Sequence, residues 1–217
     1  MSQKRYDRLT SLGKVGVLTM SGKAYHALIS ELARKGMKYV PLLSGQPIPL
    51  DVRVIITTDR SESAIQGRSV VIFEEVSDPR RAVEESILLL LGKVRFRELV
   101  LGIDPGKQTG LAVLGDGVVL ETGTYTEAKA LVEEVVRVLS AFPSERSVVK
   151  IGRGAEEYSR ILRSALRSRL PAVEIQIVEE AGTTTDNLPP EEEGMSRNIV
   201  SAIRIALRQG EKTGRDD

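Results

Sequence analysis

The sequence contains no cysteine and no tryptophan among its 217 residues, and its single histidine is His26. The absence of cysteine excludes disulfides, thiolate metal sites and cysteine nucleophiles. Carboxylates and other oxygen ligands would therefore have to hold any metal, and such ligands favour Mg²⁺ or Mn²⁺ over Zn²⁺. A lone histidine among apolar helix neighbours is more often a structural residue than a ligand.

Long apolar runs and a large net charge are also missing. The longest uninterrupted apolar run, residues 87–91, is far too short to span a bilayer, and the first residues lack the apolar stretch of a signal peptide. We therefore expect a cytoplasmic protein. The net charge of +1, with 28% charged residues, gives no overall basic field of the kind typical of nucleic-acid binding, although it leaves room for a local basic face.

Residues 1–95 show strands alternating with helices, which predicts a small Rossmann-like or flavodoxin-like α/β domain. Ser21 is placed to cap the first helix. The polar residues 57–59 follow a strand, where ligands of open α/β sheets tend to bind, but no motif indicates a role for this domain. The expected strands are residues 14–20, 39–43, 52–57 and 69–73, and the expected helices are residues 21–36 and 78–92.

Residues 96–217 follow a different order. The stretch LVLGIDPGKQTGLAV, residues 99–113, predicts two strands joined by a stiff turn with Asp104 at its mouth, because Pro105 fixes its own φ and Gly110 permits close backbone approach. A third strand follows after a tight turn, so these three strands must be antiparallel. The later elements are a helix capped by Thr126, then strand, helix, strand and helix. The order predicts a mixed sheet of antiparallel and then parallel strands.

The GIDPG motif at residues 102–106 and this order of elements resemble the RNase H-like superfamily, in particular its RuvC and YqgF-type branch of Holliday junction resolvase-like proteins. The short turn between Gly106 and Gly110 is more similar to poorly characterised archaeal members. In that family the aspartate of the motif binds a catalytic divalent metal. The resemblance therefore implies that Asp104 is a ligand for Mg²⁺ or Mn²⁺ in phosphodiester hydrolysis.

The resemblance also implies further site residues. The sequence VEEAGTTT, residues 178–185, is similar to the family's VDERxTT, which puts Glu180 at the metal-binding glutamate and Glu179 at the neighbouring aspartate. At the start of the last helix, Asn198 and Ser201 occupy positions where the family has aspartates. Asn198 can still offer a carbonyl oxygen to the metal and Ser201 can bind it through water, but both lack the charge that makes metal binding tight. The acidic residues Asp186, Glu191, Glu192 and Glu193 are either a replacement ligand or a solvated loop.

Nucleic acid is the partner that the resemblance implies. Lys107 in the first turn and Arg153 after the fourth strand are the candidate phosphate contacts, together with the arginine-rich helix at residues 156–170. The apolar spacing of that helix predicts that Ile161 is buried and that Arg163 is exposed to solvent. Members of the RuvC-like branch commonly dimerise, so a homodimer stays open, although no interface is indicated.

Three functions follow from this sequence. The first is a metal-dependent nuclease for DNA or RNA, with Asp104 and Glu180 as catalytic residues. The second is a catalytically degenerate module that binds nucleic acid or a protein, which Asn198 and Ser201 favour. The third is an actin-like ATP-dependent phosphotransferase built on the Asp104 hairpin. The third is disfavoured, because those enzymes close ATP between two duplicated RNase H-like domains and this chain has room for one.

Overall fold

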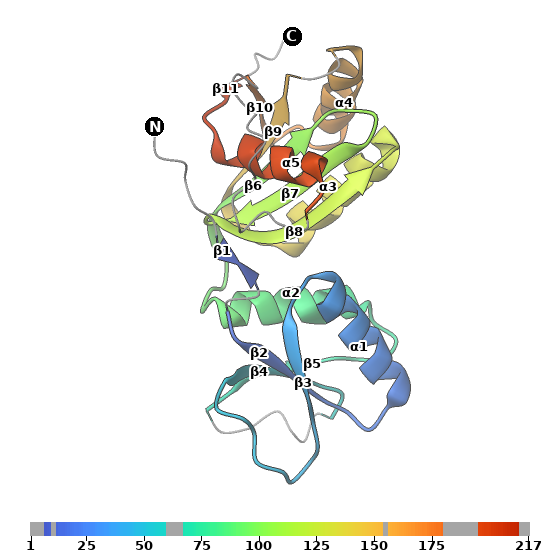
Figure 1. Ribbon diagram of the computed structural model, residues 1–217, viewed down its shortest axis with the longest axis vertical. Helices are drawn as coiled ribbons and strands as arrows, with labels where there is room; N and C mark the ends of the chain where they lie inside the picture. Colours follow the sequence, from blue (N-terminus) through green and yellow to red (C-terminus); the bar gives the residue numbers. More distant parts are fainter. Residues whose placement is uncertain (1–6, 10–11, 60–66, 154–155, 180–194, 213–217) are drawn as a thin grey trace. The chain divides into compact units, whose positions relative to one another are not determined.

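The computed structural model describes residues 7–9, 12–59, 67–153, 156–179 and 195–212. The chain forms two compact units (Figure 1). We call residues Arg8–Arg95 the N-terminal unit, and Phe96–Asp217 together with Met1–Asp7 the C-terminal unit. None of the helices in the described ranges is long and apolar enough to cross a membrane.

The N-terminal unit is a parallel four-stranded sheet with two helices, as the alternation of its sequence predicts. Ser21 caps the first helix by accepting a hydrogen bond from the backbone N–H of Ala24 at 3.2 Å. Asp78 caps the second helix in the same way. The elements are β2 (Lys14–Leu18), α1 (Gly22–Arg34), β3 (Lys38–Leu42), β4 (Val52–Thr57), β5 (Ser69–Ile72) and α2 (Pro79–Leu90), and the strand order is β3-β2-β4-β5.

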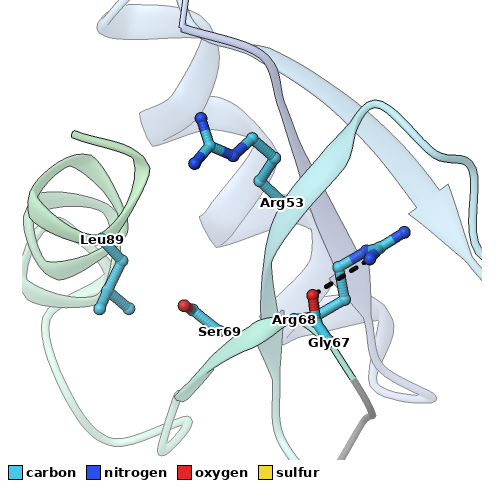
Figure 2. Close-up of a pocket in the computed structure, with 5 residues that line it drawn as sticks. All are labelled: Arg53, Gly67, Arg68, Ser69 and Leu89. Atoms are coloured by element: carbon cyan, nitrogen blue, oxygen red, sulfur yellow. Dashed lines mark hydrogen bonds between the residues drawn. The ribbon is translucent and has the colours of Figure 1, made fainter. Parts of the chain in front are cut away.

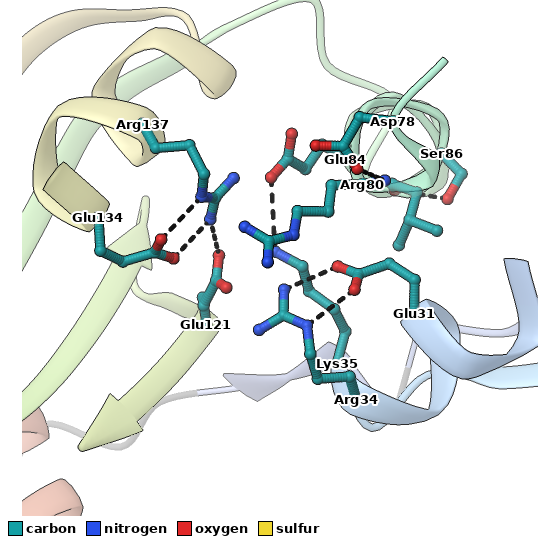
Figure 3. Close-up of polar contacts among 11 residues, drawn as sticks. Glu31, Arg34, Lys35, Asp78, Arg80, Glu84, Ser86, Glu121, Glu134 and Arg137 are labelled. Atoms are coloured by element: carbon teal, nitrogen blue, oxygen red, sulfur yellow. Dashed lines mark hydrogen bonds and ion pairs between the residues drawn. The ribbon is translucent and has the colours of Figure 1, made fainter. Parts of the chain in front are cut away.

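Buried charges join α1 to α2 in this unit (Figure 3). The ammonium group of Lys35, at the end of α1, lies 3.7 Å from the carboxylate of Glu84 on α2, and both side chains are almost fully buried. On α1 itself, Arg34 donates two hydrogen bonds to Glu31 at 2.7 and 2.8 Å. A buried ion pair is sensitive to the removal of one partner, so the packing of α1 on α2 depends on Lys35 and Glu84 together.

The C-terminal unit has the mixed sheet that its sequence predicts. β8, β7 and β6 are antiparallel, whereas β6, β9 and β10 are parallel, which is the RNase H-like arrangement. Two-residue strands complete both edges, β1 (Asp7–Arg8) beside β8 and β11 (Glu211–Lys212) beside β10. The other elements are β6 (Phe96–Asp104), β7 (Thr109–Gly115), β8 (Val118–Tyr125), α3 (Ala128–Ala141), β9 (Ser144–Gly152), α4 (Glu156–Arg169), β10 (Glu174–Val178) and α5 (Arg197–Leu207).

Two glycines let α5 lie directly on the sheet (Figure 1). A side chain at Gly102 would clash with the carbonyl oxygen of Ala202, and one at Gly110 would clash with the carbonyl oxygen of Asn198. Lys150 on β9 then caps the other end of α5, because its ammonium group donates to the carbonyl oxygens of Ala206 and Arg208. We call the side of the sheet that α5 covers the α5 face. The helix packs there through close backbone contacts and an apolar cluster, whose members are Val100, Ala112, Leu114, Val119, Ala202, Ile203 and Ala206.

Helices α3 and α4 cover the opposite face. Side chains of the sheet that point away from α5 contact these two helices. Thr109 donates a hydrogen bond to Tyr158 of α4, and Glu121 forms an ion pair with Arg137 of α3. Two predictions about these helices are wrong. The N-cap of α3 is Glu127, not Thr126, and no side chain caps it. Ile161 is 48% exposed instead of buried, because the inward face of α4 passes through Ser159 and Leu162.

Candidate functional site

The parallel strands of the C-terminal unit end at one edge of its sheet, which we call the carboxyl edge. The register pairs Ile103 of β6 with Ile151 of β9, and Ile151 with Ile177 of β10. Asp104 is the last residue of β6 and Glu179 directly follows β10, and these two strands lie two positions apart, about 10 Å across the sheet. This edge brings Asp104 and Glu179 into one region, with β9 between the two carboxylates.

Asp104 is half-buried and lies on the face that α5 covers. It pairs in register with Gly110, where the backbone of α5 approaches the sheet closely. The start of α5 brings Asn198 to the same place, and half-buried Ser201 follows one turn later. The side-chain amide of Asn198 donates a hydrogen bond of 2.8 Å to the carbonyl oxygen of Gln108. Asn198 thus ties the β6–β7 turn to α5, a structural role for a residue at an expected ligand position.

Arg153 separates Asp104 from Glu179 along this edge. It follows β9, and its guanidinium forms an ion pair of 2.6 Å with Glu179, with both side chains more than half exposed. Its backbone N–H donates to the carbonyl oxygen of Val178, which keeps the end of β9 against β10. The cation at the end of β9, the strand beside β6, is therefore Arg153, and it is paired with the predicted carboxylate Glu179.

The described part of this edge does not by itself contain a complete set of ligands for a divalent metal. Phosphodiester hydrolysis by metal ions needs carboxylates that converge on the ion. Within the ranges given above, no group of three or more histidine, cysteine, aspartate or glutamate side chains converges in this way. Several of the predicted ligands lie outside the described residues, namely Glu180, Asp186, Glu191, Glu192 and Glu193.

A cavity of about 490 Å³ opens beside Arg153, on the face that α4 covers. Ser159 is only 6% exposed, and its hydroxyl has no hydrogen-bond partner among the described residues. The Nε of Arg163, one turn further along α4, is also buried without a partner. We call this the α4 cavity; its lining residues are Gly152, Arg153, Glu156, Ser159, Arg163 and Ile177.

Sequence reasoning missed the α4 cavity because it placed Arg163 on the solvent face and overlooked Ser159. The available signal was a serine in the inward stripe of α4, where apolar residues are usual, followed four residues later by an arginine. On the same helix, Glu157 and Arg160 form an exposed ion pair. A hydrogen bond from Arg160 lowers the pKa of Glu157 and in turn raises the pKa of Arg160.

The N-terminal unit has polar groups at both ends of its sheet. At the carboxyl ends of its strands, the hydroxyls of Thr19 and Thr58 are 2.6 Å apart, and the backbone N–H of Asp59 donates to Thr57. At the amino ends of β4 and β5 there is a cavity of about 460 Å³, which we call the β4–β5 cavity (Figure 2). It is lined by Arg53, Gly67, Arg68, Ser69 and Leu89.

The arginines of the β4–β5 cavity differ from each other. Figure 2 shows Arg68 turned away from Leu89, with a hydrogen bond of 3.1 Å from its guanidinium to the carbonyl oxygen of Gly67. Its Nε is buried and has no partner among the described residues. Arg53 follows the first residue of β4 and is exposed. This cavity is thus a basic pocket at the end of a parallel sheet that ligands rarely use.

The N-terminal unit is similar to a known protein family. A family model described as a response regulator receiver-like domain matches residues 14–90. No curated protein sequence gave a significant match. The matched range begins with β2 and ends with α2, so it coincides with the parallel four-stranded unit.

Several solved structures are similar to larger parts of the chain. Marinitoga piezophila Argonaute, in complex with 5′ OH guide RNA, is 10% identical at a TM-score of 0.28 over 81% of this chain and 40% of that one. The C-terminal lobe of a budding yeast Argonaute is 10% identical at a TM-score of 0.24, covering 82% of this chain and 56% of that one. A mitochondrial ornithine carbamoyltransferase from Coccidioides immitis is 10% identical at 0.25, over 79% and 56%. The chain thus spans 40–56% of these proteins, and similarity this distant carries no argument about function.

Proposed function

We propose that the C-terminal unit binds nucleic acid through phosphate contacts at its carboxyl edge. The observation that carries this proposal is the position of three exposed cations that come from three separate segments: Lys107, Arg153 and Arg197. Lys107 and Arg197 flank the hydrogen bond between Gln108 and Asn198. Arg153 follows β9, the strand beside β6.

Such an edge suits a phosphate backbone better than a small neutral ligand. Lysine and arginine side chains contribute most phosphate contacts, and guanidinium groups bind phosphate oxygens in pairs. Asp104 and Glu179 lie at the same edge and reduce its net positive charge. We therefore expect moderate affinity that depends strongly on salt, because each phosphate contact releases a counterion.

Fluorescence anisotropy of the full chain with labelled single-stranded and double-stranded RNA and DNA, measured across a salt series, tests this proposal. The test variant is Lys107→Gln/Arg153→Gln/Arg197→Gln. Its slope of log affinity against log salt should fall by about one for each lost contact. The matched control Arg53→Gln/Arg81→Gln/Arg95→Gln removes three exposed cations from the N-terminal unit, so the net charge of the two variants is equal.

Two results would overturn the proposal. One is equal loss of affinity in the test variant and in the control, since this would reduce the effect to overall charge. The other is the absence of binding at low salt for every nucleic acid tried. Retained binding in the control, together with a lower slope in the test variant, would locate the interface at the carboxyl edge.

A second candidate function is metal-dependent phosphodiester hydrolysis, with Asp104 and Glu180 as ligands of Mg²⁺ or Mn²⁺. The half-buried carboxylate of Asp104 at the end of β6 favours it, because an acid beside the start of α5 is where the resemblance puts metal chemistry. In this candidate the two carboxylates would hold the ion, which would activate water and neutralise charge on the leaving oxygen.

Cleavage assays separate the two candidates. Labelled linear, flapped and four-way-junction DNA and RNA are incubated with Mn²⁺ and either the intact protein, Asp104→Asn, Glu180→Gln or the control Glu157→Gln, which changes an exposed glutamate on α4. Cleavage that disappears in the first two variants alone would establish the hydrolase. Binding by the intact protein without cleavage would support the binding module.

A further inference from the structure

We propose that the α4 cavity is a phosphate pocket, which receives one phosphate group of the nucleic-acid strand. This inference rests on the proposed function and deepens it, because it assigns a chemical class of ligand to one place at the carboxyl edge. It is carried by Ser159 and Arg163, two residues outside the set of exposed cations discussed above.

Both residues present unused hydrogen-bonding groups to the cavity. Ser159 and Arg163 are four residues apart on α4, so they lie on one face of the helix, one turn from each other. The Ser159 hydroxyl and the Arg163 Nε are buried, and neither has a partner among the described residues. Buried polar groups are almost always hydrogen-bonded, so two buried donors that line one cavity and lack a partner among the described residues are suited to bind an acceptor from a ligand.

The charges around the cavity favour an oxyanion, with two carboxylates in opposition. Arg163 forms no ion pair within the described ranges, and Arg153 supplies a second guanidinium at the cavity wall. α4 begins at Glu156, so the positive end of its dipole lies at the cavity as well. The carboxylate of Glu156 opposes an anion, and Glu179 competes for Arg153. An exposed pair such as Arg153–Glu179 is weak and can be exchanged for a phosphate oxygen.

The position and size of the cavity agree with this assignment. It lies at the carboxyl ends of parallel strands β9 and β10, beside the helix that follows β9, which is where open α/β sheets bind their ligands. A volume of about 490 Å³ lies in the usual range for small-ligand sites, so the cavity has room for a phosphate and the sugar attached to it. A tetrahedral phosphate carries enough oxygens to satisfy several donors at once.

The experiment measures binding of inorganic phosphate to the full chain by calorimetry, and binding of matched oligonucleotides with a 5′-phosphate or a 5′-hydroxyl by anisotropy. Arg163→Gln should weaken phosphate binding about tenfold, and Ser159→Ala about threefold, as expected for a charged and a neutral hydrogen bond. Glu156→Gln should strengthen binding. The control is Arg160→Gln, which removes an exposed arginine of the same helix that is paired with Glu157 and should change binding less than about twofold.

Folding does not confound this test. Ser159→Ala removes a hydroxyl that has no partner among the described residues, so the melting temperature of this variant should be no lower than that of the intact protein. A stronger effect of Arg163→Gln on the 5′-phosphorylated oligonucleotide than on the 5′-hydroxyl one would identify a terminal phosphate as the ligand. Equal effects on both would identify an internal phosphate. Either result supports the pocket.

The outcomes that contradict the pocket differ from those that contradict the proposed function. Nucleic-acid binding that is lost in the carboxyl-edge triple variant but unchanged by Arg163→Gln and Ser159→Ala would overturn the pocket alone. The protein could instead bind phosphate through Arg163 and bind no nucleic acid. That result would show that the phosphate does not come from a nucleic-acid strand, and it would overturn the proposed function as well. Equal effects of Arg163→Gln and Arg160→Gln would reduce the result to the charge of α4.

Discussion

The α1–α2 pair of the N-terminal unit and the α4 cavity of the C-terminal unit treat buried polar side chains in opposite ways. Between α1 and α2, the buried carboxylate of Glu84 faces the buried ammonium of Lys35. Within α2, the buried Ser86 hydroxyl donates to the carbonyl oxygen of Val83 at 2.7 Å. In the α4 cavity, the Ser159 hydroxyl and the Arg163 Nε have no partner in the described structure. Paired groups of the first kind hold a fold together, whereas unpaired groups of the second kind cost stability unless a ligand satisfies them.

The two cavities make the same distinction. They are of similar volume, and each is lined by two arginines and one serine. Of these two cavities, the α4 cavity alone lies at the carboxyl ends of parallel strands. Ser69 in the β4–β5 cavity is half-buried, whereas Ser159 is only 6% exposed. Strand direction and the state of the buried hydroxyl, more than volume or arginine content, therefore separate a ligand site from a surface hollow.

The largest expected effect comes from breaking the buried pair between α1 and α2. Glu84→Leu leaves the buried ammonium of Lys35 without this carboxylate, which should lower the free energy of unfolding of the N-terminal unit by about 3–5 kcal/mol. Hydrogen exchange of the α1 and α2 amides measures this loss separately from the C-terminal unit. Glu85→Gln, at the neighbouring exposed position, is the control. If Lys35→Met/Glu84→Leu is as unstable as the single variant, the pairing argument fails.

The second effect concerns the attachment of α5, which depends on missing side chains instead of charges. Gly102→Ala places a methyl group against the carbonyl oxygen of Ala202 and the backbone of Ala206, so we expect a loss of about 1–3 kcal/mol and faster exchange of the α5 amides. Gly106→Ala is the matched control, because a side chain there meets only ordinary contact with Gln108. Similar losses in the two variants would contradict the role of close backbone packing.

A smaller effect is expected at Ser159, where stability and ligand binding should separate. Without ligand, Ser159→Ala should not lower the free energy of unfolding, because the hydroxyl has no hydrogen-bond partner among the described residues. Added phosphate should raise the melting temperature of the intact protein more than that of the variant, since a ligand stabilises the state that binds it. Differential scanning calorimetry with and without phosphate measures both. Equal shifts would show that the hydroxyl does not contact the ligand.

Much of this architecture could be predicted from the sequence, because periodicity and turn residues are local signals. The strand at residues 52–57, the cap at Ser21 and the antiparallel hairpin that ends at Asp104 all match the structure. The two-residue strands β1 and β11 were not predicted, since such short edge strands depend on tertiary pairing and leave no pattern. The buried position assigned to Ile161 was wrong, because the orientation of α4 is set by packing that the sequence does not display.

The site was less predictable than the fold, because its properties depend on strand order and on which partners a side chain finds. Asp104 lies at the end of β6, as the motif predicts. Arg153 lies between Asp104 and Glu179 because β9 lies between β6 and β10, and this strand order is not evident from the motif. The hydrogen bond from Asn198 to Gln108 joins residues far apart in the chain. Gly110, expected to serve the turn, is required instead where α5 touches the sheet.

The smallest expected effect comes from exposed ion pairs, of which each unit offers one for comparison. Hydrogen bonds from Lys14 and Arg160 lower the pKa of Asp51 and of Glu157 respectively. A carboxyl group whose pKa is lower in the folded state stabilises the fold above its unfolded pKa, and this stabilisation is lost as the pH falls through the folded value. Both pairs therefore contribute above about pH 5 and fade in more acidic solution.

Asp51→Asn and Glu157→Gln should each flatten the pH dependence of unfolding slightly in that acidic range and leave it unchanged near neutrality. Because both carboxylates are exposed, solvent screening keeps the effect close to the detection limit, well below that of Glu84→Leu. Urea unfolding monitored by circular dichroism across the pH range measures it. If either variant lowered the free energy of unfolding at neutral pH as much as Glu84→Leu does, burial would not explain the stabilising effect of the Lys35–Glu84 pair.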